Sequence, residues 1–335
     1  MAFTTLAVQR IDTSPLVVSV TIVTWNSGDT IKACLDALFN QTFTELEVIV
    51  IDNNSDDGTL DILQEYPCLK ILRQDSNLGF CKGHNLGIAQ AHGKYILPLN
   101  PDVVMTETYI ANLVKAAESD PQVGIVAGKL LLTPPETNSP SVGVIDSTGL
   151  FLKKTRQQFL RGHGQLDSEV YNQPEYIFGA CGAAPLYRKE MLEACKFENQ
   201  YFDEAFFAHK EDVDLAWRAQ LLGWTSIYTP EAVAFHPRTF RPGHRPGISK
   251  EIRRHAVKNR YLLLLKNELF ATFIRHALPI LFYDLKILAY LLLFEQSSLS
   301  GLVTALALIP QALRWRKFIR AHRKVDGKYM LVWMK

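Results

Sequence analysis

Apolar and polar residues alternate in blocks along the first 127 residues of the chain. Short runs rich in β-branched residues, typical of buried strands, alternate with segments in which apolar residues recur every three or four positions, as on one face of a helix. The runs predict strands at 16–24, 47–51, 69–73, 94–99 and 123–127, and the periodic segments predict helices at 28–39, 60–66, 83–92 and 106–118. This alternation is typical of an α/β protein with a doubly wound, mostly parallel sheet flanked by helices.

The pattern changes in the second half of the chain. Residues 130–176 are rich in Pro, Gly, Ser and Thr, which indicates a long insertion or a hairpin. Ordered segments return at 177–187, 188–195 and 211–222, and after a loop at 237–246 the remainder is helical almost throughout. We therefore expect an α/β domain over 1–250 and a C-terminal helical extension over 251–335.

Polar clusters follow three of the predicted strands. They are Thr24-Trp25-Asn26, Asp52-Asn53-Asn54 and Asn100-Pro101-Asp102. Ligands of doubly wound sheets bind outside the carboxyl ends of the strands, so the three clusters predict one shared cleft. Asp52 can accept hydrogen bonds from a nucleobase or a ribose, and Asp102 can hold Mg²⁺ or Mn²⁺ against a diphosphate. Each aspartate is also a common helix N-cap, and the spacing alone leaves both interpretations open.

Three carboxylates stand together at the start of a later helix. Glu211, Asp212 and Asp214 repel one another, which raises at least one pKa and suits a proton acceptor. The alternative is an acidic first helical turn facing the macrodipole, with Asp214 and Arg218 as an ordinary surface pair. His236 follows one further strand, which can return it to the cleft, although a lone histidine is more often structural.

A small-residue segment precedes the predicted helix at 83–92. Gly79-Phe80 and Gly83-His84-Asn85 can let backbone amides approach a phosphate. As a phosphate-binding signal the segment is weak, because it matches neither Walker A nor GxGxxG.

Taken together, these motifs resemble the inverting nucleotide-sugar glycosyltransferases of family 2, which have the GT-A fold. The matching segments are VSVTIVTWNS (18–27), VIVIDNNSDDGT (48–59), NLGFCKGHNLGI (77–88), YILPLNPD (95–102), FDEAFFAHKEDVDLAWRAQLLGW (202–224) and AFHP (234–237). Their order and spacing match as well, over about residues 16–265. Each motif is weak by itself, but the ordered set is specific, and the LNPD variant looks like that of rhamnosyltransferase-like members.

The resemblance implies a place for each candidate residue. Nucleotide-sugar binding falls in 16–128 and the acceptor and catalytic part in 129–250. The expected donor-binding residues are Thr24, Trp25, Asn26, Asp52, Asn54, Gly79, Lys82, Asn85 and Asn100. Asp102 and His236 would hold a divalent metal, Mg²⁺ or Mn²⁺, and Asp212 would be the catalytic base with Glu211 beside it. The basic residues expected to stabilise the leaving diphosphate are Lys82, His236, Arg238 and Arg241.

The implied reaction moves a sugar from a nucleoside-diphosphate sugar, of the dTDP-rhamnose or UDP-hexose type, to a hydroxyl of a glycan or lipid-linked glycan. This places the chain in polysaccharide biosynthesis. One alternative is a polyprenyl-phosphate glycosyltransferase, and another is a catalytically silent nucleotide-sugar-binding protein.

Charge adds information that composition alone hides. The 335 residues are 47% hydrophobic and 21% charged, as in an ordinary folded protein, with a net charge of only +2. Residues 1–237 hold 17 Lys and Arg against 29 Asp and Glu, a balance of −12, whereas the rest hold 19 against 5, a balance of +14. No nucleic-acid recognition motif accompanies the basic part, so we expect no nucleic-acid partner. The five cysteines form no CxxC, which supports neither a zinc ribbon nor a disulfide framework.

The basic part contains the strongly apolar segment 278–294, which includes Asp284 and Lys286. It is compatible with a transmembrane helix, with an interfacial hairpin on an anionic membrane over 278–324, or with helices that pack on the catalytic domain or in a homodimer. Residues 1–15 lack the pattern of a signal peptide, which predicts no export. We therefore expect a cytoplasmic protein, peripheral on the inner face of the cytoplasmic membrane.

Overall fold

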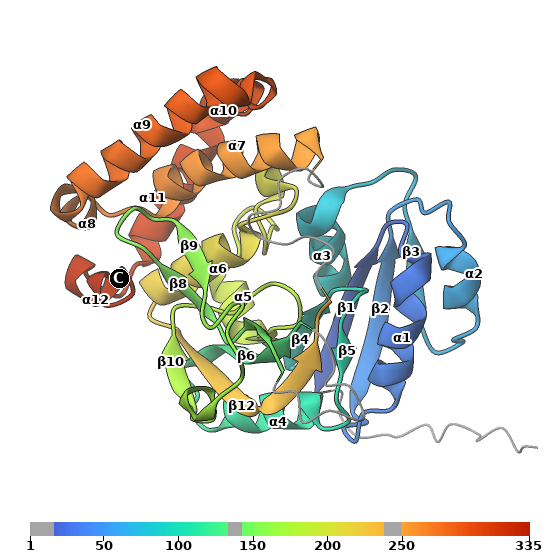
Figure 1. The fold of residues 1–335 in the computed structure, drawn as a ribbon. Helices are drawn as coiled ribbons and strands as arrows, with labels where there is room; N and C mark the ends of the chain where they lie inside the picture. Colours follow the sequence, from blue (N-terminus) through green and yellow to red (C-terminus); the bar gives the residue numbers. More distant parts are fainter. Residues whose placement is uncertain (1–16, 133–142, 238–248) are drawn as a thin grey trace, which may run out of the picture.

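The computed structural model describes residues 17–132, 143–237 and 249–335, and its centre is one mixed sheet covered by helices (Figure 1). Ten strands form this sheet, in the order β10-β12-β6-β11-β4-β1-β2-β3, with β5 paired to β12 and β7 paired to β6. A C-terminal helical region packs beside it. The α/β class and the helical extension are confirmed.

The first half of the chain builds a parallel block. Its elements are β1 (Val18–Thr24), α1 (Gly28–Phe39), β2 (Leu46–Asp52), α2 (Thr59–Gln64), β3 (Lys70–Arg73), α3 (Gly79–Ala89) and β4 (Tyr95–Leu99). Strands β4, β1, β2 and β3 are all parallel neighbours, because α1, α2 and α3 are the crossovers between consecutive strands of this block. The carboxyl ends of β1, β2 and β4 therefore meet at one edge of the sheet, as the sequence predicted.

Helix α3 begins earlier than the expected 83–92. Gly79 has φ +76°, and a Cβ atom there would lie 2.6 Å from the ring of Phe207. Glycine alone meets both conditions without strain, so the chain turns into the helix at Gly79. The hydrophobic period does not contain this information.

The second half makes the sheet mixed. Its elements are β5 (Val104–Met105), α4 (Tyr109–Glu118), β6 (Val123–Leu131), β7 (Ile145–Ser147), β8 (Leu150–Leu152), β9 (Gln158–Leu160), η1 (Glu169–Tyr171), β10 (Glu175–Ile177), β11 (Leu186–Arg188), α5 (Lys189–Cys195), η2 (Glu204–Phe206), α6 (Glu211–Leu221) and β12 (Thr225–Phe235). Strand β11 runs antiparallel to both β4 and β6 and joins the two parallel blocks. The predicted hairpin within 130–176 is present as β8 and β9.

The C-terminal helices are α7 (Lys250–Asn267), α8 (Phe270–Arg275), α9 (Ala277–Phe294), η4 (Gln296–Ser298), α10 (Leu299–Ala307), α11 (Ile309–His322) and α12 (Gly327–Leu331). Side chains of α7, α11 and α12 belong to the same buried cluster as the core of the α/β part; examples are Leu262, Ile319 and Met330. These three helices therefore pack on the catalytic part.

A buried ionic cluster anchors α7 to α6. The Lys266 ammonium, whose side chain is fully buried, lies 2.6 Å from Asp203 Oδ2 and 2.9 Å from Asp214 Oδ2. Arg218 binds the same Asp214 oxygen at 3.0 Å. Burial alone would raise the pKa of Asp214, but Lys266 and Arg218 outweigh it and lower that pKa. The expectation of a surface pair between Asp214 and Arg218 is wrong, because both side chains are buried.

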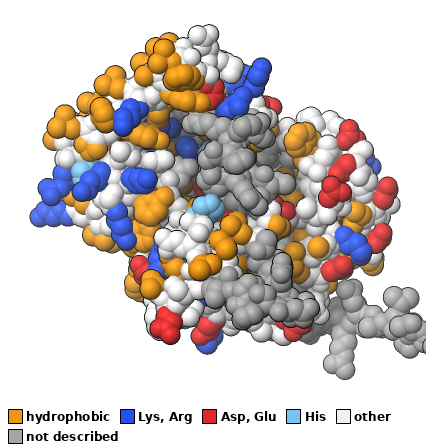
Figure 2. Space-filling view, in the orientation of Figure 1, with side chains coloured by type: hydrophobic (Ala, Val, Ile, Leu, Met, Phe, Trp, Pro, Cys, Tyr) orange, Lys and Arg blue, Asp and Glu red, His pale blue; other side chains and the backbone are white. Residues whose placement is uncertain are grey.

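Helices α8, α9 and α10 leave much of their apolar surface exposed. Hydrophobic side chains gather at the upper left of Figure 2, where Figure 1 places α9 and α10. The exposed apolar face consists of Phe270, Ile274, Leu278, Leu281, Phe282, Leu285, Leu288, Leu292, Leu293, Phe294, Val303 and Leu306. By length and composition α9 is able to cross a membrane, and only 11% of it is buried. Asp284 on α9, however, pairs with Arg260 on α7 at 2.7 Å, which fixes α9 along the protein.

Candidate active site

The end of β2 lies against the end of β1 through Asp52. Thr24 donates to Asp52 Oδ1 at 2.9 Å, and the hydroxyl and amide of Ser55 donate to the two carboxylate oxygens at 2.6 and 3.1 Å. Asp52 is completely buried. Its carboxylate thus orders the turn after β2 and ties it to the end of β1.

Two left-handed asparagines shape the neighbouring loops. Asn26 has φ +50° and Asn54 has φ +61°, a region that asparagine tolerates better than most residues. The Asn26 amide donates to the Ser55 hydroxyl at 3.0 Å, and its side-chain oxygen accepts from the Asp56 amide at 3.0 Å. The loop after β1 is thereby tied to the loop after β2, and the Trp25 ring, 57% exposed, stands free at this edge for stacking.

Three titratable side chains from different parts of the chain form a row near the end of β4. His236, at the end of β12, lies with Nε2 3.5 Å from Asp102 Oδ1 and with Nδ1 2.8 Å from Asp146 Oδ2. Burial lowers the pKa of His236, but the hydrogen bonds to Asp102 and Asp146 outweigh burial and raise it above its usual value. A carboxylate behind a histidine fixes the ring and directs the other nitrogen outward, as around bound metals.

The donor set at this point fits a hard divalent cation. Asp102 offers carboxylate oxygens and His236 offers Nε2, and Mg²⁺ or Mn²⁺ sites commonly pair one or two protein ligands with substrate phosphates. Within the described part of the chain no group of three or more His, Cys, Asp or Glu is arranged to hold a metal by itself. A cation here would therefore need oxygens from a ligand as well.

The second half of the site is the start of α6. Asp212 is half-buried, and its Oδ2 accepts from the Gly182 amide at 3.1 Å. Glu211 beside it is buried, and its Oε2 has no hydrogen-bond partner among the residues that the structure describes. Burial and the neighbouring Asp212 raise the pKa of Glu211 well above its usual value. Glu211 therefore holds a proton to higher pH than an ordinary glutamate, while Asp212 is the more accessible of the two carboxylates.

The segment before β11 joins the two halves. The Asn100 amide donates to the Ala183 carbonyl at 2.8 Å, and the adjacent Gly182 amide donates to Asp212. A Cβ atom on Gly182 would lie 3.5 Å from both Glu211 Oε1 and Asp212 Cβ. The Asn100–Asp102 turn and the carboxylates of α6 are thus two walls of one site.

The loop before α6 is held in an unusual conformation. Phe207, His209 and Lys210 all have positive φ, at +64°, +76° and +74°. Asn259 of α7 donates to the carbonyls of three loop residues at 2.6 to 3.0 Å, two of them Ala208 and His209. Strained backbone of this kind persists only where the surroundings enforce it, and it gathers at functional sites. Helix α7 therefore helps to set the position of Asp212.

Other expected donor-binding residues have different surroundings. All four hydrogen-bonding positions of Asn85 are used within the chain, by Tyr201, Phe202 and Glu204, so Asn85 fixes the 201–204 segment to α3. The Gly79 amide donates to Asn77 Oδ1 at 2.8 Å. Lys82 is exposed on α3.

Some expected residues have no described position, and the structure also gives the site a residue that was not expected. Arg238 and Arg241 lie outside the described residues. Asp146 was not expected at all, because it lies in the stretch without a regular pattern. Ser55 was visible in the NNSDDGT turn, where its spacing from Asp52 is typical of an Asx-turn.

Comparison with known proteins identifies the family of the chain. Residues 19–195 match the model of the family described as Glycosyl transferase family 2. A curated relative from Mycobacterium tuberculosis, N-acetylglucosaminyl-diphospho-decaprenol L-rhamnosyltransferase, is 28% identical over 252 residues, which cover 69% of this chain and 79% of the relative.

Two solved structures share the fold. S. aureus TarS 1-349 in complex with UDP-GlcNAc has a TM-score of 0.55 at 19% identity, covering 92% of this chain and 84% of that one. GalNAc-T7 with UDP, GalNAc and Mn²⁺ has a TM-score of 0.58 at 15% identity; the match covers 76% of this chain and 48%, about half, of that one. Both are glycosyltransferases of the GT-A fold, and at these identities they establish the fold alone.

Proposed function

Because the chain belongs to glycosyl transferase family 2 and is a GT-A glycosyltransferase, we propose that it is an inverting enzyme with Asp212 as general base. It moves a sugar from a nucleoside-diphosphate sugar to a hydroxyl of a lipid-linked glycan. The observation that supports this most directly is that the accessible Asp212 lies beside Glu211, which holds its proton. Segment 182–183 separates these two residues from Asp102 and His236.

The residues account for a single displacement. The acceptor oxygen attacks the anomeric carbon while the bond from that carbon to the diphosphate oxygen breaks, and the hydroxyl proton passes to Asp212. The Gly182 amide holds one Asp212 oxygen in place, which leaves the carboxylate oriented toward the acceptor. Attack opposite the leaving group inverts the anomeric centre, and no covalent enzyme intermediate is needed.

Asp102 and His236 are the residues that would hold a divalent cation, with Asp146 fixing the histidine ring. The cation, when bound, neutralises charge on the leaving diphosphate. Thr24, Trp25, Asn26, Asp52, Asn54 and Asn100 border the edge of the sheet where we place the donor. Trp25 supplies an exposed aromatic face, and the buried Asp52 carboxylate fixes the loops that border the donor.

The similarity to the mycobacterial rhamnosyltransferase supports a choice of donor and acceptor classes. We place the donor among dTDP-rhamnose and UDP-hexoses and the acceptor among polyprenyl diphosphate-linked sugars. Asp284 binds α9 to α7, so the exposed apolar face lies along a membrane surface rather than across it. The basic residues that follow this face, Arg314, Lys317, Arg320, Arg323 and Lys324, favour anionic lipid, as at the inner face of the cytoplasmic membrane.

A transfer assay tests the function. The purified full-length chain is incubated with dTDP-rhamnose and a panel of UDP-hexoses, a short prenyl diphosphate-linked N-acetylglucosamine as acceptor, and either Mn²⁺ or EDTA, and products are read by mass spectrometry. We expect transfer from one donor. Asp212→Asn keeps the contact with Gly182 and lowers kcat by about 10²–10⁴-fold, as loss of a general base does. Asp61→Asn, exposed on α2, is the control.

Two outcomes would contradict the proposal. Full activity in Asp212→Asn would remove Asp212 as the base. Donor binding without transfer to any acceptor would favour a silent nucleotide-sugar-binding protein.

A further inference from the structure

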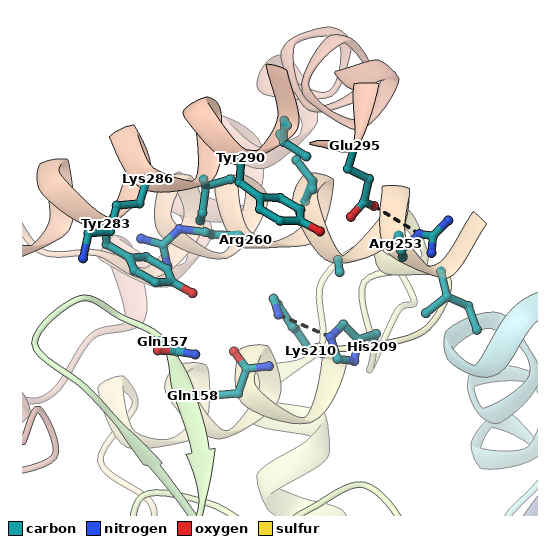
Figure 3. Close-up of a pocket in the computed structure, with 15 residues that line it drawn as sticks. Gln157, Gln158, His209, Lys210, Arg253, Arg260, Tyr283, Lys286, Tyr290 and Glu295 are labelled. Carbon is teal, nitrogen blue, oxygen red and sulfur yellow. Dashed lines mark hydrogen bonds and ion pairs between the residues drawn. The ribbon is translucent and has the colours of Figure 1, made fainter. Parts of the chain in front are cut away.

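A pocket of about 490 Å³ lies between α7, α9, the first residues of β9 and the loop before α6 (Figure 3). In Figure 3 Tyr283, Lys286 and Tyr290 extend from α9, and Gln158 and Lys210 face them from the opposite wall. The side chains assigned to the donor and to the metal are not among its lining residues.

Cationic side chains outnumber acidic ones in the lining. Lys210, Arg253, Arg260 and Lys286 contribute four positive charges, and Glu295, which pairs with Arg253 at 3.1 Å, contributes the one carboxylate among the lining residues. Even after Asp284 is counted against Arg260, the wall keeps an excess of two positive charges. Burial and the neighbouring Arg260 outweigh Asp212 and Glu211 and lower the pKa of Lys210 to about 8. A bound anion beside Lys210 and Lys286 would stabilise both ammonium groups.

The pocket adjoins the catalytic base. Lys210 directly precedes Glu211 and Asp212, and its ammonium interacts with both of these carboxylates on one side and with Arg260 on the other. The clamp of Asn259 on the loop holds Lys210 in this position. A substrate whose hydroxyl reaches Asp212 therefore has a nearby positive surface for an anionic group further along its length.

An apolar groove of about 770 Å³ runs along the other side of α9. Helices α7, α9, α10 and α11 line it mainly with leucines, among them Leu264, Leu285 and Leu302. The groove is continuous with the exposed apolar face, since Leu285 and Leu288 belong to both. The base Asp212, the cationic pocket and the apolar groove therefore lie in this order from one side of α9 to the other.

We propose that the cationic pocket binds the diphosphate of a polyprenyl-linked acceptor, with the prenyl chain passing over α9 to the apolar groove. This order matches the order of groups in such an acceptor: a sugar hydroxyl at Asp212, a doubly charged linkage at Lys210, Arg253, Arg260 and Lys286, and a hydrocarbon chain beyond. The inference rests on the proposed function for the identity of the acceptor, and its test needs no transfer.

Calorimetry with the full-length chain measures the binding. Geranyl diphosphate is the probe, geraniol and inorganic pyrophosphate are its two halves, and UDP reports on the donor site. Lys210→Gln and Lys286→Gln each raise the Kd for geranyl diphosphate about tenfold, by loss of a charge-assisted contact. Lys286 is exposed, so its substitution leaves the fold intact. Lys328→Gln, exposed on α12 away from the pocket, is the matched control and leaves this Kd unchanged.

The remaining ligands decide between sources of the anion. We expect UDP to bind all variants equally and pyrophosphate to bind more weakly than geranyl diphosphate. An equal loss of UDP affinity would assign the pocket to the donor and overturn the proposal, as would an unchanged Kd for geranyl diphosphate. Equal affinity for pyrophosphate and geranyl diphosphate would refute the placement of the prenyl chain in the apolar groove. If no sugar is transferred but these binding differences hold, the proposed function fails and the prenyl diphosphate site stands.

Discussion

Replacement of Lys266 by methionine should separate the C-terminal helices from the catalytic part. The ammonium is fully buried between Asp203 and Asp214, at 2.6 and 2.9 Å, and methionine fills nearly the same space. In the variant Asp214 keeps its pair with Arg218, whereas Asp203 loses the ammonium that lies 2.6 Å from it. Loss of one partner from a buried ionic cluster costs about 3–5 kcal/mol, or roughly 100- to 5,000-fold in the unfolding equilibrium. Methionine also keeps a favourable contact with the Trp315 ring, which Lys266 approaches to 4.2 Å, so most of the loss is electrostatic.

Urea unfolding followed by tryptophan fluorescence measures this loss. Lys328→Met, an exposed control, changes stability by less than about 0.5 kcal/mol. Lys266 helps to hold the pKa of Asp214 below its ordinary 3.8, and this contribution to stability is present above that pH and lost below it. The difference in the free energy of unfolding between wild type and Lys266→Met therefore narrows as pH falls below about 3.8. Adding Asp203→Asn to Lys266→Met should restore part of the stability. A Lys266→Met variant as stable as its control would refute the account of the ionic cluster.

Three further measurements address the site and the surface. Glu211 has a pKa in the folded state above its ordinary 4.5, so the folded state binds more protons there and loses stability as pH rises. Glu211→Gln removes this loss, and its free energy of unfolding should rise relative to that of wild type between about pH 5 and pH 7.5. Parallel plots of that free energy against pH would argue against a protonated Glu211. Asp146→Asn should weaken Mn²⁺ binding about 10- to 100-fold by calorimetry, because His236 loses its orienting carboxylate, and unchanged affinity would exclude this arrangement. Leu278 and Leu293 are 82% and 70% exposed, and replacing both by glutamate should abolish flotation with anionic liposomes. Equal flotation of wild type and the double variant would exclude a membrane role for the exposed apolar face. A wild-type dimer that becomes a monomer in the double variant would assign this face to contact with a second copy of the chain.

The first half of the fold could be predicted because its strands are buried on both faces and its helices on one. β1, β2 and β4 are continuous apolar runs, and the helix at 28–39 has the bounds that its period predicts. The start of α3 could not be predicted, since it depends on the contact of Gly79 with Phe207, more than a hundred residues away. The same holds for β11: a three-residue strand carries no period, and only pairing with β4 and β6 gives it a place.

The site divides in the same way. Asp52, Asp102 and Asp212 could be singled out from the sequence because each follows a recognisable strand or begins a recognisable helix, and their roles stay predictions. Asp146 was missed, because its significance lies wholly in its contact with His236, 90 residues away. Asp214 was misinterpreted for a related reason: an i,i+4 pair has the same spacing whether it is exposed or buried, and only Lys266 from α7 distinguishes the two.

The near-zero net charge of the chain conceals three uses of positive charge in its basic part. Lys266 is buried and neutralises carboxylates of the acidic part, so it contributes to folding and adds nothing to the surface. Arg253, Arg260 and Lys286 face the cationic pocket, where two of the three already have a carboxylate partner and an excess remains. The third use is the one we propose for the exposed basic residues after the apolar face, which is contact with anionic lipid. A truncation that removes the basic part would abolish all three contributions together, so only single substitutions can assign membrane binding, acceptor binding and stability to separate residues.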